Sequence, residues 1–487
     1  MPALVWVIAA VFVAVELVTS GRYGFMQDEL YFIEAGRHLA FGYVDQPPLM
    51  PLLDKTTGFL GLNPTAIRII PALAGGALIL TAARFAALFG AGRFGQVLAA
   101  LGIACAPVTI GADHVGNTTP LELLAWSVAL LCVTTALLRD KPRWWIGAGL
   151  AAGIGLQDNN LVVIFMIALA IGLAATMYRP VLATRWPWIA VGIAAVIWLP
   201  NLIWQATHGW PQFAMASSLH QENNSVKDYI GGVPAQLLYA GVLFFPVYIA
   251  GLVKLWRVRE LRFIAVVASL VIFYVVAWIP GRPYYTDGLL PAILAAGAVA
   301  AEGWAKRARW PSFRRTILIA APLVGMLVLL PELLPIVPVT AVHSLPMSAQ
   351  QNSDIGDTVG FPQLARAIVA QDAALTRAGE RPTSIYAGYY GEAAAVNVLV
   401  PSHHPLPPVL SGQNAYWMWG PGNASDRTVL VVDALGPLRP YFASCRLLTT
   451  FHAPYHVDNG WTNIPIGVCT GPTANWKAIW PHLKYYG

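Results

Sequence analysis

The sequence predicts a polytopic α-helical membrane protein with about eleven transmembrane helices and a small extracytoplasmic α/β domain at its C-terminus. Of its 487 residues, 57% are hydrophobic and only 11% are charged, with a mean hydropathy of +0.58. Soluble proteins carry about a quarter charged residues, so an ordinary soluble enzyme is excluded. Apolar runs long enough to cross roughly 30 Å of hydrocarbon recur up to about residue 337. Beyond that point short apolar runs alternate with polar turns.

The apolar runs define the expected spans. They cover residues 3–20, 69–90, 94–111, 118–138, 144–157, 160–178, 187–204, 233–253, 262–279, 287–304 and 316–337. The fifth run is short, so the fifth and sixth runs are open to interpretation as one broken unit. The first run lacks the basic residues and the A-x-A site of a cleaved signal peptide, so we expect it to remain as a helix.

The Lys and Arg residues alternate between the connections in a way that predicts orientation. With a cytoplasmic N-terminus, the inside connections and adjoining helix ends hold Arg84, Arg93, Arg139, Lys141, Arg143, Arg179, Arg185, Lys254, Arg257, Arg259, Arg262, Lys306, Arg307, Arg309, Arg314 and Arg315. Cytoplasmic loops collect such residues. The net charge of +6 therefore reflects topology, and no nucleic-acid partner is needed to explain it.

Two domains are expected, a transmembrane domain over 1–340 and an outer α/β domain over 341–487. In the outer domain, residues 383–390, 428–434 and 445–451 have the composition of strands. Residues 361–379 have helical apolar spacing and a glycine stop.

The four cysteines divide between the two domains. Cys105 and Cys132 fall inside spans and are expected to be unreactive packing residues. Cys445 and Cys469 lie in the outer domain, where an oxidising compartment favours a disulfide between them. A metal site that also uses His452 or His456 is the less favoured alternative.

The first outer connection, residues 21–68, is unusually long and acidic. The stretch 28–42 alternates apolar and polar residues as a helix lying in the membrane interface does. Pro47 and Pro48 stop that helix, and a second amphipathic segment follows. A plain spacer would not need the acids Asp28 and Glu29.

Every outer connection contributes ionisable or polar side chains. They are Asp28, Glu29, Glu34, Asp45, Asp113, His114, Asp158, Asn159, Asn160, His208, His220, Glu222, Arg282, Tyr284, Tyr285 and Asp287. Acids at membrane depth are costly and usually functional, so we expect a shared outward-facing cavity. For single residues the alternatives stay open: an Asp can cap a helix or be solvated, and the two tyrosines can belong to an interfacial aromatic belt.

Several stretches match one family in order along almost the whole chain. They are "DELYF", "GYVDQPPL", "GADHVGNTTPLELL", "LPNLIWQATHGWPQF", "GRPYYTDGLLPAILAAGA", "YYGEAAAVNV" and "SGQNAYWMWGP". The chain thereby resembles the GT-C superfamily of polyprenyl-phosphate-sugar-dependent glycosyltransferases, in the branch of the protein O-mannosyltransferases and lipid A aminoarabinose transferases. The resemblance implies that Asp28 is the catalytic carboxylate, with Glu29 beside it.

The chain departs from that family at two places. Many relatives have a Lys that faces the acidic site after the fifth span, where this chain has Gln157, Asp158, Asn159 and Asn160. Relatives often have Lys before Pro-Tyr-Tyr, where this chain has Arg282. Arginine keeps the charge and adds a fork that suits phosphate oxygens.

The predicted reaction follows from the chemistry of sugar transfer. Asp28 would take the proton of the attacking acceptor oxygen, and Arg282 would stabilise the departing phosphate, so that the anomeric configuration inverts. Asp113 would orient the acceptor or support Asp28, and His114 would touch phosphate. We also expect Asp158, Tyr284 and Tyr285 to contact substrate.

The sequence indicates no cofactor, although a divalent cation stays open. There is no P-loop, H-E-x-x-H or dinucleotide motif. A nucleotide sugar would need a soluble nucleotide on the outer face, where little is available, so a lipid-borne donor is favoured. The acceptor is a glycan, a lipid or a protein, and the expected location is a bacterial plasma membrane. The alternatives are a secondary transporter, which should show repeated halves, and a non-catalytic protein that binds lipid-linked glycans.

Overall fold

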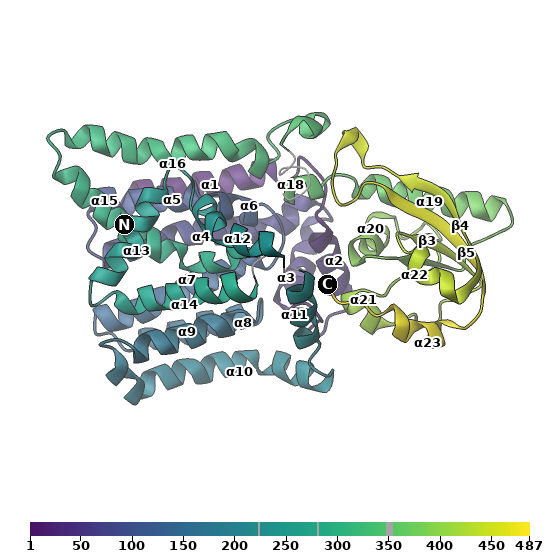
Figure 1. The fold of residues 1–487 in the computed structure, drawn as a ribbon, viewed down its shortest axis with the longest axis horizontal. Helices are drawn as coiled ribbons and strands as arrows, with labels where there is room; N and C mark the ends of the chain where they lie inside the picture. The colour runs from purple at the N-terminus through teal and green to yellow at the C-terminus, as the bar shows by residue number, and fades with distance from the viewer. Residues whose placement is uncertain (223–224, 280–281, 347–353) are drawn as a thin grey trace.

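A helical bundle and a smaller α/β domain lie end to end, and the first long connection fills the junction between them (Figure 1). The computed structural model describes residues 1–222, 225–279, 282–346 and 354–487. Gly281, part of one matched stretch, lies outside the described residues. The two-part architecture agrees with the prediction of a membrane protein with a C-terminal α/β domain.

A helix lies on each of the eleven expected spans. The bundle contains α1 (Ala3–Thr19), α4 (Pro64–Leu88), α5 (Arg93–Ala104), α6 (Pro107–Asp113), α7 (Thr119–Leu138), α8 (Trp144–Leu156), α9 (Val162–Ala174), α10 (Arg185–Thr207), α11 (Pro211–Glu222), α12 (Val226–Tyr239), α13 (Phe245–Arg257), α14 (Arg262–Trp278), α15 (Leu290–Lys306) and α16 (Pro311–Leu333). Within the described residues, five helices are long and apolar enough to cross a membrane, or six if α5 and α6 form one bent span, and α1, α8, α9 and α14 are shorter apolar helices.

Burial distinguishes the inner helices from the outer ones. The apolar windows of α4 and of the helix ending at Lys306 are 72% and 78% buried, whereas those of α10 and α16 are 22% and 11% buried. Figure 1 shows α16 and α10 along opposite edges of the bundle. Since their exposed residues are mainly Val, Leu, Ile and Trp, these two edges face lipid.

Two expected spans are broken in the structure. The span 94–111 bends by 54° between α5 and α6, because Pro107 begins a new helix and disfavours helical geometry in the residue before it. The span 233–253 is interrupted between α12 and α13, where Gly241 has φ +91° and Pro246 starts the next helix. The fifth and sixth runs are separate helices, since α8 packs on α7 and α10 while α9 packs on α14.

The first long connection forms the two expected helices, α2 (Gln27–Arg37) and α3 (Leu49–Thr57). Leu30 and Tyr31 on α2 are buried, and α2 packs on α20 (Tyr390–Leu399) of the C-terminal domain. A β-carbon at Gly391 would lie 2.8 Å from Cβ of Gln27, so glycine is needed for this close approach. α2 is therefore enclosed between the domains, which differs from the surface helix that the sequence predicts.

The C-terminal domain contains a five-stranded sheet of order β2-β1-β3-β5-β4. Its elements are α18 (Asp354–Asp357), α19 (Phe361–Arg377), β1 (Ser384–Ala387), α20, β2 (Val409–Ser411), α21 (Asn414–Trp419), β3 (Thr428–Val432), α22 (Leu435–Leu438), β4 (Phe442–Phe451), β5 (Ile464–Pro472) and α23 (Trp476–Ile479). β2, β1 and β3 are parallel, and β5 is antiparallel to both β3 and β4.

Three of these strands and the long helix agree with the sequence prediction, but β2 and β5 were missed. β2 has only three residues, and β5 carries two prolines and two glycines, which weaken a strand signal. The expected disulfide is confirmed: Cys445 and Cys469 are directly opposite each other on β4 and β5 and are bonded. Both thiols are therefore unavailable to a metal.

Candidate active site

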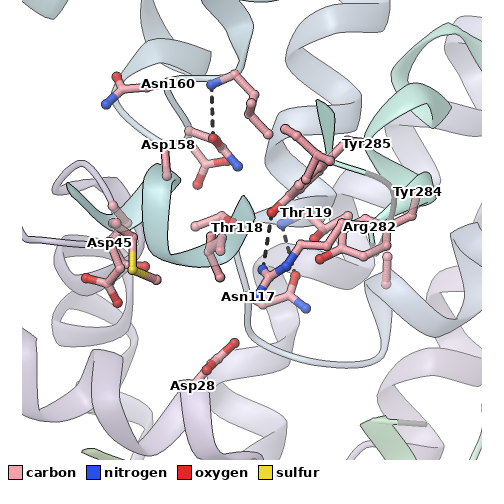
Figure 2. A pocket seen from close by; sticks show the side chains of 18 of the residues that line it. Asp28, Asp45, Asn117, Thr118, Thr119, Asp158, Asn160, Arg282, Tyr284 and Tyr285 are labelled. Carbon is pink, nitrogen blue, oxygen red and sulfur yellow. Dashed lines mark hydrogen bonds between the residues drawn. The ribbon is translucent and has the colours of Figure 1, made fainter. Parts of the chain in front are cut away.

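A cavity of about 1040 Å³ lies where the bundle meets the C-terminal domain. Its walls come from α2, the connections after α6, α8 and α10, the 3₁₀ helix η3 (Pro283–Leu289), and the C-terminal domain. Figure 2 shows side chains from these separate segments converging on one space. Its volume is at the upper end of the range for small-molecule sites, so it has room for more than one substrate group.

Asp28 stands in the first turn of α2 and lines this cavity. Its Oδ1 accepts a 2.7 Å hydrogen bond from the Tyr390 hydroxyl of the C-terminal domain. Burial raises the pKa of the Asp28 carboxyl, while Tyr390 and the positive charge of Arg282 act in the opposite direction. Asp28 is thus a more basic carboxylate than usual that still has stabilising partners for its charged form.

Arg282 lines the same cavity, immediately before η3. Its Nη1 donates to the hydroxyl of Tyr285 at 3.3 Å, and the rings of Tyr284 and Tyr285 are in contact, with centroids 4.7 Å apart. Among the described residues that line the cavity, Arg282 is the one Lys or Arg side chain. The fold therefore brings the connection between α1 and α4 together with the connection between α14 and α15, and places one fixed positive charge where it acts on Asp28.

Glu29 does not line the cavity, although it is adjacent to Asp28 in sequence. Its buried carboxylate accepts from Arg68 Nε at 2.7 Å and from Arg68 Nη2 at 2.9 Å. The backbone N–H groups of Gly116 and Met26 donate to its two oxygens, each at 2.8 Å. Glu29 therefore ties α2 to α4 and to the α6–α7 connection.

Asp113 and His114 lie at the end of α6 and are both buried. A β-carbon at Gly75 would lie 2.0 Å from Asp113 Oδ2, so α4 packs directly against this acid, which is absent from the cavity lining. His114 does line the cavity. Its Nδ1 lies 3.0 Å from Oε2 of Glu16 on α1, and its Nε2 is buried without a hydrogen-bond partner in the described part of the chain.

Asp158 is fully buried against the cavity in the connection after α8. Neither of its carboxylate oxygens has a hydrogen-bond partner among the described residues. The neighbouring Asn159 donates from Nδ2 to Glu122 Oε2 at 2.7 Å, so amides and acids occupy the place where the resemblance leads one to expect a Lys. Such unsatisfied buried acceptors need donors, which a substrate with hydroxyl groups would supply.

Several residues to which the sequence assigned no role in the reaction contribute to the site. Asp45 lines the cavity, accepts a 2.9 Å hydrogen bond from Tyr31, and has its pKa raised by burial to about 7. Tyr390 lay inside a matched stretch, and Glu16 was a lone acid in an apolar run, which is an available signal. Arg68 had no such signal, because its place just before a span fits a membrane-boundary residue equally well.

No three His, Cys, Asp or Glu side chains converge as a metal site anywhere in the described ranges. Asp28 and Asp45 are the two carboxylates of α2 and the following loop that face the cavity. The charged and titratable side chains of the cavity wall include Asp28, Asp45, Asp158, His114 and Arg282.

Comparison with known proteins gives the same picture of the fold. Residues 45–204 match the family model described as dolichyl-phosphate-mannose-protein mannosyltransferase. The crystal structure of ArnT from Cupriavidus metallidurans bound to undecaprenyl phosphate is similar with a TM-score of 0.59 and 15% identity, over 97% of this chain and 100% of that chain. The apo state of ArnT from the same organism gives 0.57 and 16%, over 96% and 98%.

No curated protein sequence matches the chain. At this level of identity the two structures show a shared fold, and they show it over nearly the full length of both chains. The matched segment 45–204 includes Asp45, His114 and Asp158 from the cavity wall.

Proposed function

We propose that the chain, whose fold is similar to that of ArnT, is a glycosyltransferase of the GT-C superfamily. In this proposal it transfers a sugar from a polyprenyl-phosphate donor to an acceptor hydroxyl or amine in the cavity at the domain junction. The observation that carries this proposal is the placement of Asp28 and Arg282 on one cavity, with Tyr390 holding the carboxylate. A base and a fixed cation that share one space are what this reaction requires. One of the similar structures is ArnT bound to undecaprenyl phosphate, which supports a lipid-phosphate donor.

In the proposed step, Asp28 removes the proton from the acceptor. The acceptor atom forms a bond to the anomeric carbon while the bond from that carbon to the phosphate oxygen breaks. The phosphate leaves with the electron pair, and the guanidinium of Arg282 stabilises its added negative charge. Because attack and departure occur on opposite faces, the anomeric configuration inverts.

The surroundings of Asp28 suit the role of base. A general base works best when its pKa is close to the working pH, and burial moves the pKa of this carboxyl upward. The Tyr390 hydroxyl bonds Oδ1 of Asp28, and the Asp28 side chain lines the cavity. Tyr390 is therefore a positioning residue, and it makes the C-terminal domain part of the site.

We assign Glu29 and Asp113 to positioning roles in the same reaction. Glu29 fixes the rotation of α2 about its own axis through the ion pair with Arg68, and so determines the direction of the Asp28 side chain. Asp113 adjoins His114 and supports the end of α6. His114, held at Nδ1 by Glu16, presents Nε2 to a phosphate oxygen of the donor.

Asp158, Tyr284 and Tyr285 are assigned to substrate contact. The tyrosine pair flanks Arg282, where rings pack well against the first isoprene unit or the sugar face. Asp158 accepts hydrogen bonds from sugar hydroxyls.

The topology we propose has a cytoplasmic N-terminus and an extracytoplasmic C-terminal domain, so that transfer takes place on the outer face of a bacterial plasma membrane. The alternation of basic residues along the connections supports this orientation. The acceptor is a glycan, a lipid or a protein of the cell envelope.

The decisive experiment incubates purified protein with radiolabelled undecaprenyl-phosphate sugars and cell-envelope acceptors. We expect labelled product from the wild type and none from Asp28→Asn, with unchanged thermal unfolding. An active Asp28→Asn variant would overturn the assigned base. Solute uptake by proteoliposomes without a glycosidic product would instead favour a transporter, and tight donor binding without turnover would favour a glycan-binding protein.

A further inference from the structure

A second cavity, of about 370 Å³, is strongly basic. Its walls are formed by Arg84, Ala87, Leu88, Leu131, Thr135, Arg139, Lys141 and Trp144. Three of these eight residues are cations, none is an acid, and the others are mainly apolar. A cavity with this composition fits a ligand that has both a negative charge and an apolar part.

The position of this cavity along α7 places it at the opposite membrane boundary from the large cavity. Thr119, the first residue of α7, lines the large cavity, and Arg139, just after its last residue, lines the basic one. The 20 residues of α7 at about 1.5 Å each give roughly 30 Å, which is the thickness of the hydrocarbon core. The two cavities therefore open at opposite leaflets.

The end of α7 brings cations from distant parts of the chain together. Asp140 has φ +48°, and the N–H of Lys141 bonds the carbonyl of Ala136 at 3.1 Å, which is the pattern of a Schellman turn. This turn folds the chain back at the helix end, so that Arg139 and Lys141 lie near Arg84 of α4.

The three cations are available for a ligand. None of the ion pairs formed between described side chains includes Arg84, Arg139 or Lys141, and all three side chains are exposed. Leu88 and Leu131 supply apolar walls, and Trp144, which is 42% exposed, has the amphipathic ring that is enriched at headgroup level.

We propose that this basic cavity, lined by Arg84, Arg139, Lys141 and Trp144, binds the phosphate of an anionic phospholipid in the leaflet opposite the C-terminal domain. The guanidinium and ammonium groups contact phosphate oxygens, and the glycerol and first acyl carbons lie against Leu88, Leu131 and Trp144. Basic pockets between transmembrane helices bind anionic headgroups in this way. The apolar walls favour a lipid over free phosphate. This site is independent of the proposed sugar transfer.

The test uses full-length protein and native mass spectrometry with added phosphatidylglycerol or phosphatidylcholine. The variant Arg84→Gln/Arg139→Gln removes two lining charges, and Arg93→Gln/Arg143→Gln is the matched control, because both of its residues neighbour the cavity in sequence without lining it. At about 1 kcal/mol per basic side chain, we expect phosphatidylglycerol to bind about 30-fold more weakly to the first variant and almost unchanged to the control. The charge-preserving Arg84→Lys should retain most of the binding.

Three results would overturn the proposal. They are equal binding of both lipids by the wild type, equal weakening in the control variant, and displacement of the lipid by millimolar inorganic phosphate. Exposed side chains tolerate such substitutions well, and thermal unfolding of each variant verifies the fold. Sugar-transfer activity is not a readout here, so failure of this proposal leaves the proposed function untouched.

Discussion

Replacing Glu29 with Gln tests whether the two adjacent acids of α2 have different roles, Glu29 in stability and Asp28 in catalysis. Four donors surround the Glu29 carboxylate: Nε and Nη2 of Arg68 and the backbone N–H groups of Met26 and Gly116. An amide has one acceptor oxygen and an NH₂ group that is itself a donor. Each carboxylate oxygen accepts from two of these donors. Whichever way the new amide turns, its NH₂ group therefore faces two donors, and two hydrogen bonds are lost.

The larger cost is the charge of Arg68. Its side chain is 1% exposed, and the partners that it keeps are all uncharged: the carbonyl oxygens of Ser20 and Gly24, at 2.6 and 2.9 Å, and the one amide oxygen of the new side chain. Breaking a buried pair by removing one charge typically costs about 3–5 kcal/mol, because the other charge stays buried without compensation. We therefore expect Glu29→Gln to lower the free energy of unfolding by about that amount.

The assay is denaturant unfolding of purified protein in detergent, followed by tryptophan fluorescence, together with sugar-transfer activity below the unfolding transition. Asp28→Asn is the matched control, since it changes a neighbouring carboxylate to its amide in the same helix turn. We expect Asp28→Asn to unfold like the wild type and to be inactive, and Glu29→Gln to be less stable with part of its activity left. A Glu29→Gln variant with wild-type stability and no activity would refute the structural role and restore Glu29 as a catalytic group.

Three further predictions concern other parts of the molecule. Burial raises the pKa of Asp45 to about 7 in the folded state, so between about pH 4 and pH 7 the folded state keeps a proton that the unfolded state has released. The free energy of unfolding of the wild type should therefore fall as the pH rises from about 4 to 7. Asp45→Asn should flatten this fall, which unfolding measured at pH 5 and pH 8 checks. Glu16→Gln keeps a hydrogen-bonding group at His114 Nδ1 but removes its charge, and a hydrogen bond to a charged group is worth about 1 kcal/mol more than a neutral one. Turnover should therefore drop roughly 5-fold, with an altered pH profile that a purely structural role would leave unchanged. Cys445→Ser should destabilise the C-terminal domain by about 3 kcal/mol, as expected for a link across 24 residues, and Cys469→Ser should have the same effect. The rate at which a protease cleaves the domain measures both variants, and a cleavage rate equal to that of the wild type would contradict the expectation.

The sequence predicted the parts of this protein that are determined by local composition. Each apolar run coincides with a helix in the described part of the chain, because hydrocarbon thickness imposes a length that the sequence displays directly. The breaks inside two of those runs were not expected, although Pro107 and Gly241 mark them. Strand β5 was missed because its prolines and glycines resemble a turn, and its stability comes from pairing with β3 and β4.

Contacts between distant segments were beyond the reach of the sequence. Asp28 and Tyr390 are 362 positions apart, and no periodicity reports that α20 packs on α2. Arg282 was identified as the best phosphate partner from its charge and its side of the membrane alone, and the structure then placed it on the same cavity as Asp28. Arg68 was overlooked, because a basic residue at a membrane boundary is ordinary and its acid partner is 39 positions away.

The different surroundings of Asp28 and Glu29 follow from helix geometry. Consecutive residues of an α-helix point about 100° apart, so two adjacent acids near the start of α2 necessarily face different neighbours. The face of Glu29 meets Arg68 and two backbone N–H groups, which stabilise a permanent negative charge and leave no oxygen for a substrate. The face of Asp28 meets the cavity and a single hydroxyl donor, so one oxygen stays available to take a proton. The Glu29–Arg68 pair fixes the rotation of α2, and the position of the proposed base therefore depends on an ion pair that never contacts the substrate.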